Sequence, residues 1–316
     1  MQIEKTITFD ARRAPIISVV IATYNRASLL RETLDSIVTQ SFQDFEVIVV
    51  DDGSTDETEA VVKSYGELLR YIRQENRGPS GARNVGIQNA RAKWISIQDS
   101  DDICTPDHLE SLYRIVEKRN DLGMVFANGG YVGGPKEKTI IPQEKSKRLA
   151  QNGVRLLDLF DVSIVRLQAA LLSRQVLLAI GGLDETLRIA MDLDLAFRVI
   201  MRFPVAYLDK VVFFYRRHEG SIGGDEELRQ LENLKVIDKL VQDFPETIEM
   251  LGRQRINRRK AHRFYRLAKW RWKIGERDGA REAIRNAIIL RPYFPKYRLY
   301  QLLGEMLYSR PVGRTE

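Results

Sequence analysis

The sequence predicts an α/β protein with an open, mostly parallel sheet covered by helices on both faces, followed by an α-helical C-terminal region. Between residues 15 and 224, short runs rich in Val and Ile alternate with segments of helical periodicity. The strand-like runs are almost continuously apolar, which is typical of strands buried on both faces. From residue 225 only helical periodicity remains. We therefore expect an N-terminal extension over 1–14, an α/β domain over 15–224 and a basic helical region over 225–316.

The composition fits this division. The chain has 316 residues with 44% hydrophobic content, enough for one large domain and an appendage. Its single cysteine, Cys104, excludes an intramolecular disulfide. The charged first residues do not resemble a signal peptide, and no apolar run approaches the roughly 20 residues of a membrane span. We expect a cytoplasmic protein, with peripheral attachment to the inner face of the plasma membrane as a further option.

The first half of the chain repeats one pattern: an apolar strand, a polar segment at its carboxyl end, and then a helix. A helix with apolar positions between Leu29 and Val38 is expected after the first strand, further helices are expected at 57–65 and 106–119, and a flexible loop entering a helix is expected over 76–86. The expected strands are 16–22, 45–50, 69–72 and 93–97.

An acidic segment, Ile97-Gln98-Asp99-Ser100-Asp101-Asp102, directly follows the fourth strand. Three carboxylates this close repel one another unless a cation or strong donors offset their charge. Hard oxygen ligands suit Mg2+ or Mn2+. The alternative is that Asp102 or its neighbours cap the helix expected to start near Pro106. The segment alone leaves both interpretations open.

Three polar segments end three strands of the predicted sheet: Tyr24-Asn25, Asp51-Asp52 and 99–102. Open parallel sheets bind ligands beyond the carboxyl ends of their strands, so these segments should share one rim. The chain has no G-x-G-x-x-G after its first strand and no G-x-x-x-x-G-K-[ST]. This argues against a dinucleotide dehydrogenase or a P-loop NTPase.

The second half of the α/β domain contains less regular elements. A strand is expected at 123–127, a long mobile loop at 129–152, and an apolar run at 167–172. After a short helix at 175–180 and a turn at 181–185, a helix over 191–200 opens with two carboxylates. Two further strands, 205–208 and 211–215, precede a polar segment containing Arg216, Arg217, His218 and Ser221. His218 is either part of the rim or a surface-loop histidine.

Five motifs occur in a familiar order: SVVIATYNR at 18–26, VDDGSTD at 50–56, GARNVG at 81–86, DSDD at 99–102, and GGLDE at 181–185 with DLDL at 192–195. Together they resemble the family 2 glycosyltransferases of the GT-A fold, over roughly residues 15–223. The resemblance implies an inverting transfer of sugar from a nucleotide-diphosphate donor, most readily a UDP-sugar, in bacterial cell-surface polysaccharide or glycolipid synthesis. The implied acceptor is a saccharide or a lipid-linked molecule.

The resemblance also assigns roles to residues. Tyr24 would flank the base, Asp52 would accept a hydrogen bond from it, and Arg83 would approach the acidic segment or the diphosphate. Asp192 would be the catalytic base. The implied donor-binding residues are Ala22, Tyr24, Asn25, Arg26, Asp52, Arg83, Asp99 and Ser100, and the implied Mn2+ or Mg2+ ligands are Asp101, Asp102 and His218.

One position departs from the family pattern. The acceptor-side motif usually reads Glu-Asp, and here it reads Met191-Asp192. A catalytically silent protein that binds a nucleotide sugar or a partner is therefore the alternative function. Asp194 is expected to be structural, either as a carboxylate in the first turn of a helix or as the partner of Arg198 four residues on.

The C-terminal region is helical and basic. An amphipathic helix is expected over 226–244, and Ala268, Gly275, Ala280, Ala287 and Pro292 have the spacing of a tetratricopeptide-like helical hairpin. Residues 253–316 hold 18 Lys+Arg against 5 Asp+Glu, a net charge of +13, with aromatic residues interleaved. An anionic membrane surface contacting 253–310 is the favoured partner. Nucleic acid ranks below it, a solvated basic face remains the alternative, and the sequence specifies no oligomeric state.

Overall fold

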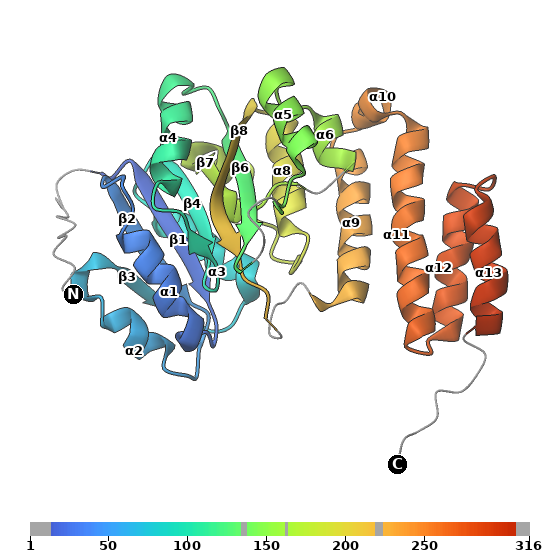
Figure 1. Cartoon of the computed structure of the whole chain (residues 1–316), viewed down its shortest axis with the longest axis horizontal. Helices are drawn as coiled ribbons and strands as arrows, with labels where there is room; N and C mark the ends of the chain where they lie inside the picture. Colours follow the sequence, from blue (N-terminus) through green and yellow to red (C-terminus); the bar gives the residue numbers. More distant parts are fainter. Residues whose placement is uncertain (1–13, 134–137, 162–163, 219–223, 308–316) are drawn as a thin grey trace, which may run out of the picture. The chain divides into compact units, whose positions relative to one another are not determined.

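The computed structural model describes residues 14–133, 138–161, 164–218 and 224–307, with only the backbone described at 305–307. The chain divides into two compact units, 1–218 and 219–316 (Figure 1). Most of the expected N-terminal extension lies outside the described residues, as do Ser221 and Arg310.

An eight-stranded sheet in the order β3-β2-β1-β4-β7-β6-β8-β5 forms the centre of the first unit. The pairs β1–β2, β1–β4, β2–β3 and β6–β8 are parallel, and those of β7 with β4 and β6, and of β5 with β8, are antiparallel. The predicted mostly parallel α/β sheet is therefore confirmed. The strands are β1 (Ile17–Thr23), β2 (Phe45–Asp51), β3 (Arg70–Arg73), β4 (Trp94–Asp99), β5 (Ile103–Cys104), β6 (Met124–Tyr131), β7 (Ala170–Ser173) and β8 (Val205–Tyr215).

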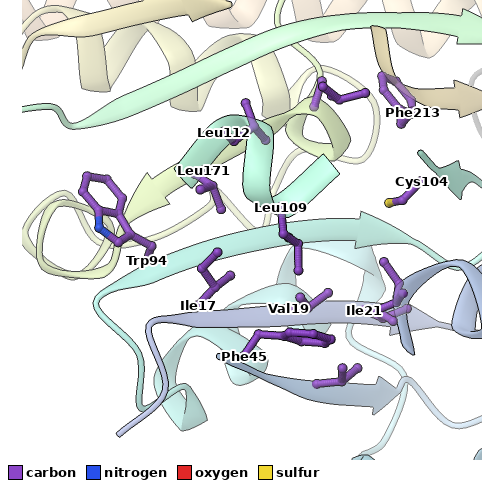
Figure 2. Close-up of a cluster of buried hydrophobic side chains, with 14 of the residues drawn as sticks. Ile17, Val19, Ile21, Phe45, Trp94, Cys104, Leu109, Leu112, Leu171 and Phe213 are labelled. Atoms are coloured by element: carbon purple, nitrogen blue, oxygen red, sulfur yellow. The ribbon is translucent and has the colours of Figure 1, made fainter. Parts of the chain in front are cut away.

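Helices cover both faces of this sheet, as predicted. On one face, alternate residues of β1 and β2 pack in a single core with side chains of α1 and α4 (Figure 2). On the other face, Val20 of β1 lies against α3. The helical segments of this unit are α1 (Ala27–Val38), α2 (Thr58–Lys63), η1 (Gly66–Leu68), α3 (Gly78–Asn89), α4 (His108–Lys118), α5 (Gln143–Asn152), α6 (Leu156–Asp161), η2 (Leu167–Ala169), α7 (Arg174–Ala179) and α8 (Met191–Ile200).

The strands form because their β-branched side chains pack on both faces of the sheet. Ile17, Val19 and Ile21 are fully buried, and each contributes about 1.5–3 kcal/mol of burial free energy. Figure 2 shows these side chains near Leu109 of α4 and Phe45 of β2. This packing fixes where each strand ends, and so fixes the rim.

The segment expected as a flexible loop entering a helix over 76–86 is already helical from Gly78. Its residues have low helix propensity, but tertiary contacts hold them in place. A Cβ on Gly86 would lie 2.2 Å from Val20 Cγ1, so glycine allows α3 to approach β1 this closely. The Ser80 hydroxyl donates to Leu187 O (2.8 Å), and the Asn84 amide donates to Leu183 O (2.9 Å).

The prediction of a long loop over 129–152 is wrong at both ends. β6 continues to Tyr131, and α5 begins at Gln143. The Asn128 side chain accepts from Ile141 N (2.8 Å) and donates to Ile141 O (2.8 Å), which joins the two ends of the connection. The strands expected at 205–208 and 211–215 form one strand, β8, with register shifts opposite Ala127–Gly129.

The second unit contains only helices within the residues described. The expected 226–244 helix is α9, and the expected hairpin is formed by α11 and α12. Ala268, Ala280 and Ala287 are fully buried in the core of this unit, so small side chains allow the close approach, as predicted. No helix in the described part of the chain is long and apolar enough to cross a membrane. The helices are α9 (Glu226–Asp243), α10 (Thr247–Leu251), α11 (Arg253–Lys273), α12 (Arg277–Leu290) and α13 (Pro295–Leu307).

Candidate active site

The carboxyl ends of β1, β2 and β4 meet at one edge of the sheet. Ala22 of β1 pairs with Val50 on one side and with Asp99 on the other. The polar segments that follow the three strands therefore share one rim, as the sequence predicts.

Two of the rim loops are joined by hydrogen bonds. Asn25 adopts a left-handed conformation (φ 49°), its backbone N–H donates to Ser54 Oγ (2.9 Å), and its side-chain oxygen accepts from Thr55 N (2.8 Å). Between these bonds and the end of β1, Tyr24 is 46% exposed, which is high for an aromatic residue. An exposed ring held on an ordered loop suits stacking against a planar ligand.

Asp52 is buried, and both of its carboxylate oxygens have protein partners. Oδ1 accepts from Gln74 Nε2 (2.7 Å) and Arg77 N (2.9 Å), and Oδ2 accepts from Gly78 N (2.8 Å). Asp52 therefore holds the start of α3 against the rim. A carboxylate offers about four lone-pair sites, so one further donor can still be accommodated.

Arg83 lies beneath the rim and contacts residues from both sides of the site. Its Nη2 forms an ion pair with Asp99 Oδ1, and its Nη1 lies 2.6 Å from the Met191 sulfur. Burial opposes the charged guanidinium, but the carboxylates of Asp99 and Asp192 outweigh it and raise the pKa of Arg83. One cation thus links the acidic segment to the start of α8.

The acidic segment brings three carboxylates together. Ligand oxygens of Asp99, Asp101 and Asp102 all lie within 4.8 Å of one another, and Ser100 is buried among them. Asp101 Oδ2 lies 2.8 Å from His218 Nε2 and 3.7 Å from Arg26 Nε. His218 and Arg26 therefore reach the cluster through Asp101.

Asp102 does not cap a helix, because α4 begins only at His108. Its backbone carbonyl accepts from Thr33 Oγ1 (2.8 Å), and its Oδ1 accepts from Arg216 N (2.9 Å). Its other oxygen, Oδ2, is buried and has no hydrogen-bond partner among the residues that the structure describes. Burial, together with the charge of Asp99, raises the pKa of Asp102 to about 9.

These observations fit a hard divalent cation. Oxygen donors, their mutual proximity and the buried Asp102 Oδ2, which has no partner in the described part of the chain, are features that suit Mn2+ or Mg2+. Burial and the neighbouring Asp99 also raise the pKa of Asp101. A cation would offset the repulsion that raises both values.

Asp192 lies in the first turn of α8, close to the cluster. Its Oδ2 accepts a long hydrogen bond from Leu167 N (3.4 Å). Burial raises the pKa of Asp192, while the charges of Arg83 and Arg166 oppose the shift. Asp192 is half-buried by its solvent exposure, and a carboxylate with a raised pKa is well suited to accept a proton.

The neighbouring carboxylate is structural, as expected. Asp194 forms a buried ion pair with Arg198 (Oδ2 to Nη2, 2.7 Å), four residues on in the same helix. Met191 replaces the acid of the family pattern, and its sulfur also lies 3.3 Å from Ser80 Oγ. The Met191 side chain is buried, so the position that an acid holds in the family pattern is buried and uncharged in this chain.

The short segment η2 holds two rim residues that the sequence analysis missed. Gln168 Nε2 donates to Asp99 Oδ2, and the adjacent Leu167 N–H bonds Asp192. Arg166 adds a positive charge beside Asp192. The only signal in the sequence was the interruption of an apolar run, 164–172, by Arg166 and Gln168.

A buried polar network supports the acidic segment from below. His108 Nδ1 lies 3.0 Å from Val212 O, and its Nε2 lies 3.2 Å from Gln98 Nε2. Because a carbonyl can only accept, Nδ1 carries the proton and Nε2 accepts from Gln98. Gln98 Nε2 also donates to Gln168 O (3.1 Å), and Cys104 Sγ donates to Gln98 Oε1 (3.3 Å).

A mostly parallel sheet with an acidic cluster at its carboxyl edge and a carboxylate on a facing helix places the chain in the class of GT-A-like transferases. The family model described as glycosyl transferase family 2 matches residues 18–178. The chain belongs to this family, as its motifs predict.

Relatives in curated collections point the same way. An uncharacterized glycosyltransferase of Rickettsia prowazekii is 30% identical over 226 residues, 69% of this chain and 69% of the relative. An uncharacterized glycosyltransferase of Rickettsia bellii is 33% identical over 218 residues, 66% of this chain but only 31% of the relative. The glycosyltransferase GlyA of Streptococcus pneumoniae is 41% identical over 112 residues, 34% of this chain and 16% of GlyA.

Solved structures share the fold at low identity. TarS of S. aureus (residues 1–349) has a TM-score of 0.66 and 19% identity, covering 93% of this chain and 88% of TarS. A complex of the same protein with UDP-GlcNAc has a TM-score of 0.64, 19% identity and coverage of 93% and 89%. The mannosyltransferase PcManGT of Pyrobaculum calidifontis, in complex with GDP-Man and Mn2+, has a TM-score of 0.62, 20% identity and coverage of 96% and 83%.

Proposed function

We propose that this protein transfers a hexosyl group from a nucleotide-diphosphate sugar to an acceptor hydroxyl, with inversion at the anomeric carbon. The observation that supports this most is the position of Arg83. It pairs with Asp99 of the acidic cluster and its charge acts on Asp192. This contact supports treating the cluster and Asp192, the proposed base, as parts of one site in which a donor and an acceptor would meet.

A UDP-sugar is the proposed donor. TarS was solved with UDP-GlcNAc and PcManGT with GDP-Man, and both nucleotides carry a diphosphate. In this chain the exposed Tyr24 ring would flank the base, Asp52 would accept from a base N–H, and Arg26 would approach the diphosphate. The rest of the proposed donor-binding set is Ala22, Asn25, Arg83, Asp99 and Ser100.

The proposed reaction is a single displacement. The acceptor oxygen forms a bond to the anomeric carbon while the bond from that carbon to the diphosphate oxygen breaks. The proton of the acceptor hydroxyl passes to Asp192, and the nucleoside diphosphate leaves with the bonding electrons. Asp101, Asp102 and His218 would hold Mn2+ or Mg2+, which when bound would neutralise charge on the leaving diphosphate.

The proposed acceptor is a saccharide or a lipid-linked molecule, in bacterial cell-surface polysaccharide or glycolipid synthesis. We place this activity in the cytoplasm or at the inner face of the plasma membrane. Nucleotide sugars are charged and polar, so an enzyme that uses them must meet them in an aqueous compartment.

Nucleoside-diphosphate release tests the proposal. The purified full chain is incubated with UDP-, GDP- and dTDP-sugars and Mn2+, and the nucleoside diphosphate released is quantified with and without a mixed oligosaccharide acceptor. We expect release with one donor class and its loss in Asp101→Ala and Asp192→Ala. Asp107→Ala is the matched control, because Asp107 is a half-exposed carboxylate outside the acidic cluster that pairs with Lys210.

The silent alternative predicts a different pattern. This alternative rests on Met191, which leaves the position beside Arg83 uncharged. A protein that only binds a nucleotide sugar would be stabilised by it in a thermal melt but would release no nucleoside diphosphate. Binding without release for every donor and acceptor tested would overturn the proposed transfer. Absence of both binding and release would overturn both functions.

A further inference from the structure

Helix α13 exposes a stripe of leucines. Leu299, Leu302 and Leu303 are 56%, 68% and 36% exposed, and their spacing places them on one face of the helix. The opposite face carries the buried residues: Tyr297 is 2% exposed, and a Cβ on Gly304 would lie 2.8 Å from the Trp272 ring. The leucine stripe is thus additional to the face that packs in the helical unit.

Basic side chains border this stripe on both sides. On a helix with about 3.6 residues per turn, Arg298 falls beside Leu302 and Lys296 falls beside Leu303. Both basic residues are exposed. Aliphatic residues with a basic residue on each side are typical of helices that lie in the interface of a bilayer.

The end of α12 adds to this character. Ile289 is 67% exposed and Tyr293 is 95% exposed, and the exposed Arg285 lies one turn before Ile289. Residues 277–304 contain 6 Lys+Arg and 2 Asp+Glu. Apolar and basic side chains are therefore exposed together on two successive helices of one unit.

We propose that the leucine face of α13 is the surface through which this protein docks on an anionic lipid bilayer. Leu299, Leu302 and Leu303 enter the headgroup region, while Lys296 and Arg298 contact lipid phosphates. This docking is independent of the proposed sugar transfer, because no residue of the rim takes part in it.

The basic residues beside the leucines favour an anionic bilayer over a second copy of the chain and over nucleic acid. A second copy of the chain seated symmetrically on the same face would bring its basic borders against identical ones, which is unfavourable. Nucleic acid would engage the basic residues, but its phosphate backbone would leave the leucines without an apolar partner. An anionic bilayer satisfies both the charges and the leucines.

Vesicle flotation with the full chain tests the proposal. We expect the protein to float with vesicles of phosphatidylcholine and phosphatidylglycerol, to remain in solution with phosphatidylcholine alone, and to dissociate in high salt. The double variant Leu299→Gln, Leu302→Gln should lose at least about tenfold in partitioning. The double variant Lys296→Gln, Arg298→Gln should lose about fivefold per charge.

Two matched controls test whether the effect is specific to α13. Leu178→Gln removes a leucine that is 44% exposed on α7, and Arg114→Gln removes an exposed arginine on α4. Both should float like the parent protein. Circular dichroism and a thermal melt of each variant establish that the helical unit is folded.

Three outcomes would overturn the proposal: no flotation with anionic vesicles at low salt, flotation unchanged in both α13 variants, or equal losses in the controls. A fourth outcome that would overturn the proposal comes from light scattering, which measures the oligomeric state. If the parent protein dimerises, the leucine variant is monomeric and neither floats, the face belongs to a second copy. If the leucine variant fails to fold, the charge variant alone decides, because Lys296 and Arg298 are exposed.

Discussion

Replacing His108 by Gln should remove a pH-dependent contribution to the stability of the first unit, residues 1–218, here called the catalytic unit. His108 is fully buried, and burial lowers its pKa from 6.5 to about 4. Between these values the unfolded chain binds a proton that the folded protein does not. The stability that depends on neutral His108 is therefore fully present above pH 6.5 and is lost as the pH falls toward 4.

The size of this effect follows from the two pKa values. Between pH 7.5 and 4.5, the difference in proton binding amounts to about 2.5 kcal/mol in the free energy of unfolding. Gln cannot titrate, yet it can donate to Val212 O. The parent protein should thus lose about 2.5 kcal/mol more than His108→Gln over this range.

Hydrogen exchange of the β1 and β4 amides is the appropriate measurement, because it follows opening of the catalytic unit separately from the helical unit. Exchange free energies are compared for the two proteins at several pH values, after correction for the intrinsic rate. Parallel pH profiles would refute the conclusion that His108 is neutral in the folded protein. If the stability of the variant fell more steeply with decreasing pH than that of the parent protein, the predicted contribution of His108 would have the wrong sign.

Substitutions at three other positions test the fold and the site. Gly86→Ala would force a Cβ against Val20 and should cost about 2 kcal/mol of stability in denaturant unfolding, an effect that a merely flexible loop would not show. Asp192→Asn should lower turnover at least about 100-fold with donor affinity unchanged. The acid limb of the pH–rate profile of the parent protein should lie above pH 3.8, the ordinary aspartate pKa, because burial raises the pKa of Asp192. An unchanged rate in Asp192→Asn would exclude Asp192 as the base. Gln168→Leu should weaken donor binding about tenfold by releasing Asp99, and Gln168→Glu should weaken it further by repulsion; equal binding in all three proteins would remove Gln168 from the site.

The sheet and its rim could be predicted because their signals are local. Each buried strand is a continuous apolar run, and each polar segment follows directly in the chain, as at Asp99 after β4. Parallel strands then place their carboxyl ends together without further information. The same logic located Tyr24, Asp52 and Asp101 on one edge.

The missed features depend on contacts between distant parts of the chain. Gln168 and Asp99 are 69 residues apart in the sequence, and no local sequence pattern indicates the hydrogen bond between them. Helix α5 has only Ser146 and Leu149 buried, too few apolar residues for a clear helical period. For α3 only the starting point was wrong: Gly, Pro, Ser and Asn favour loops, so the sequence predicts a loop before the helix, and the close approach of Gly86 to Val20 helps explain why the helix already begins at Gly78.

The irregular pairing of β8 limits how the chain length can vary. Between Ala127 and Gly130 of β6, the opposing strand contributes three extra residues, Asp209, Lys210 and Val212. Each has its own use, since Asp209 accepts from Ser146, Lys210 pairs with Asp107, and Val212 O accepts from His108. Deleting one residue here would turn the following side chains to the wrong face and displace His218 from Asp101. In homologous sequences we therefore expect gaps between strands, but a constant residue count from the start of β8 to this histidine.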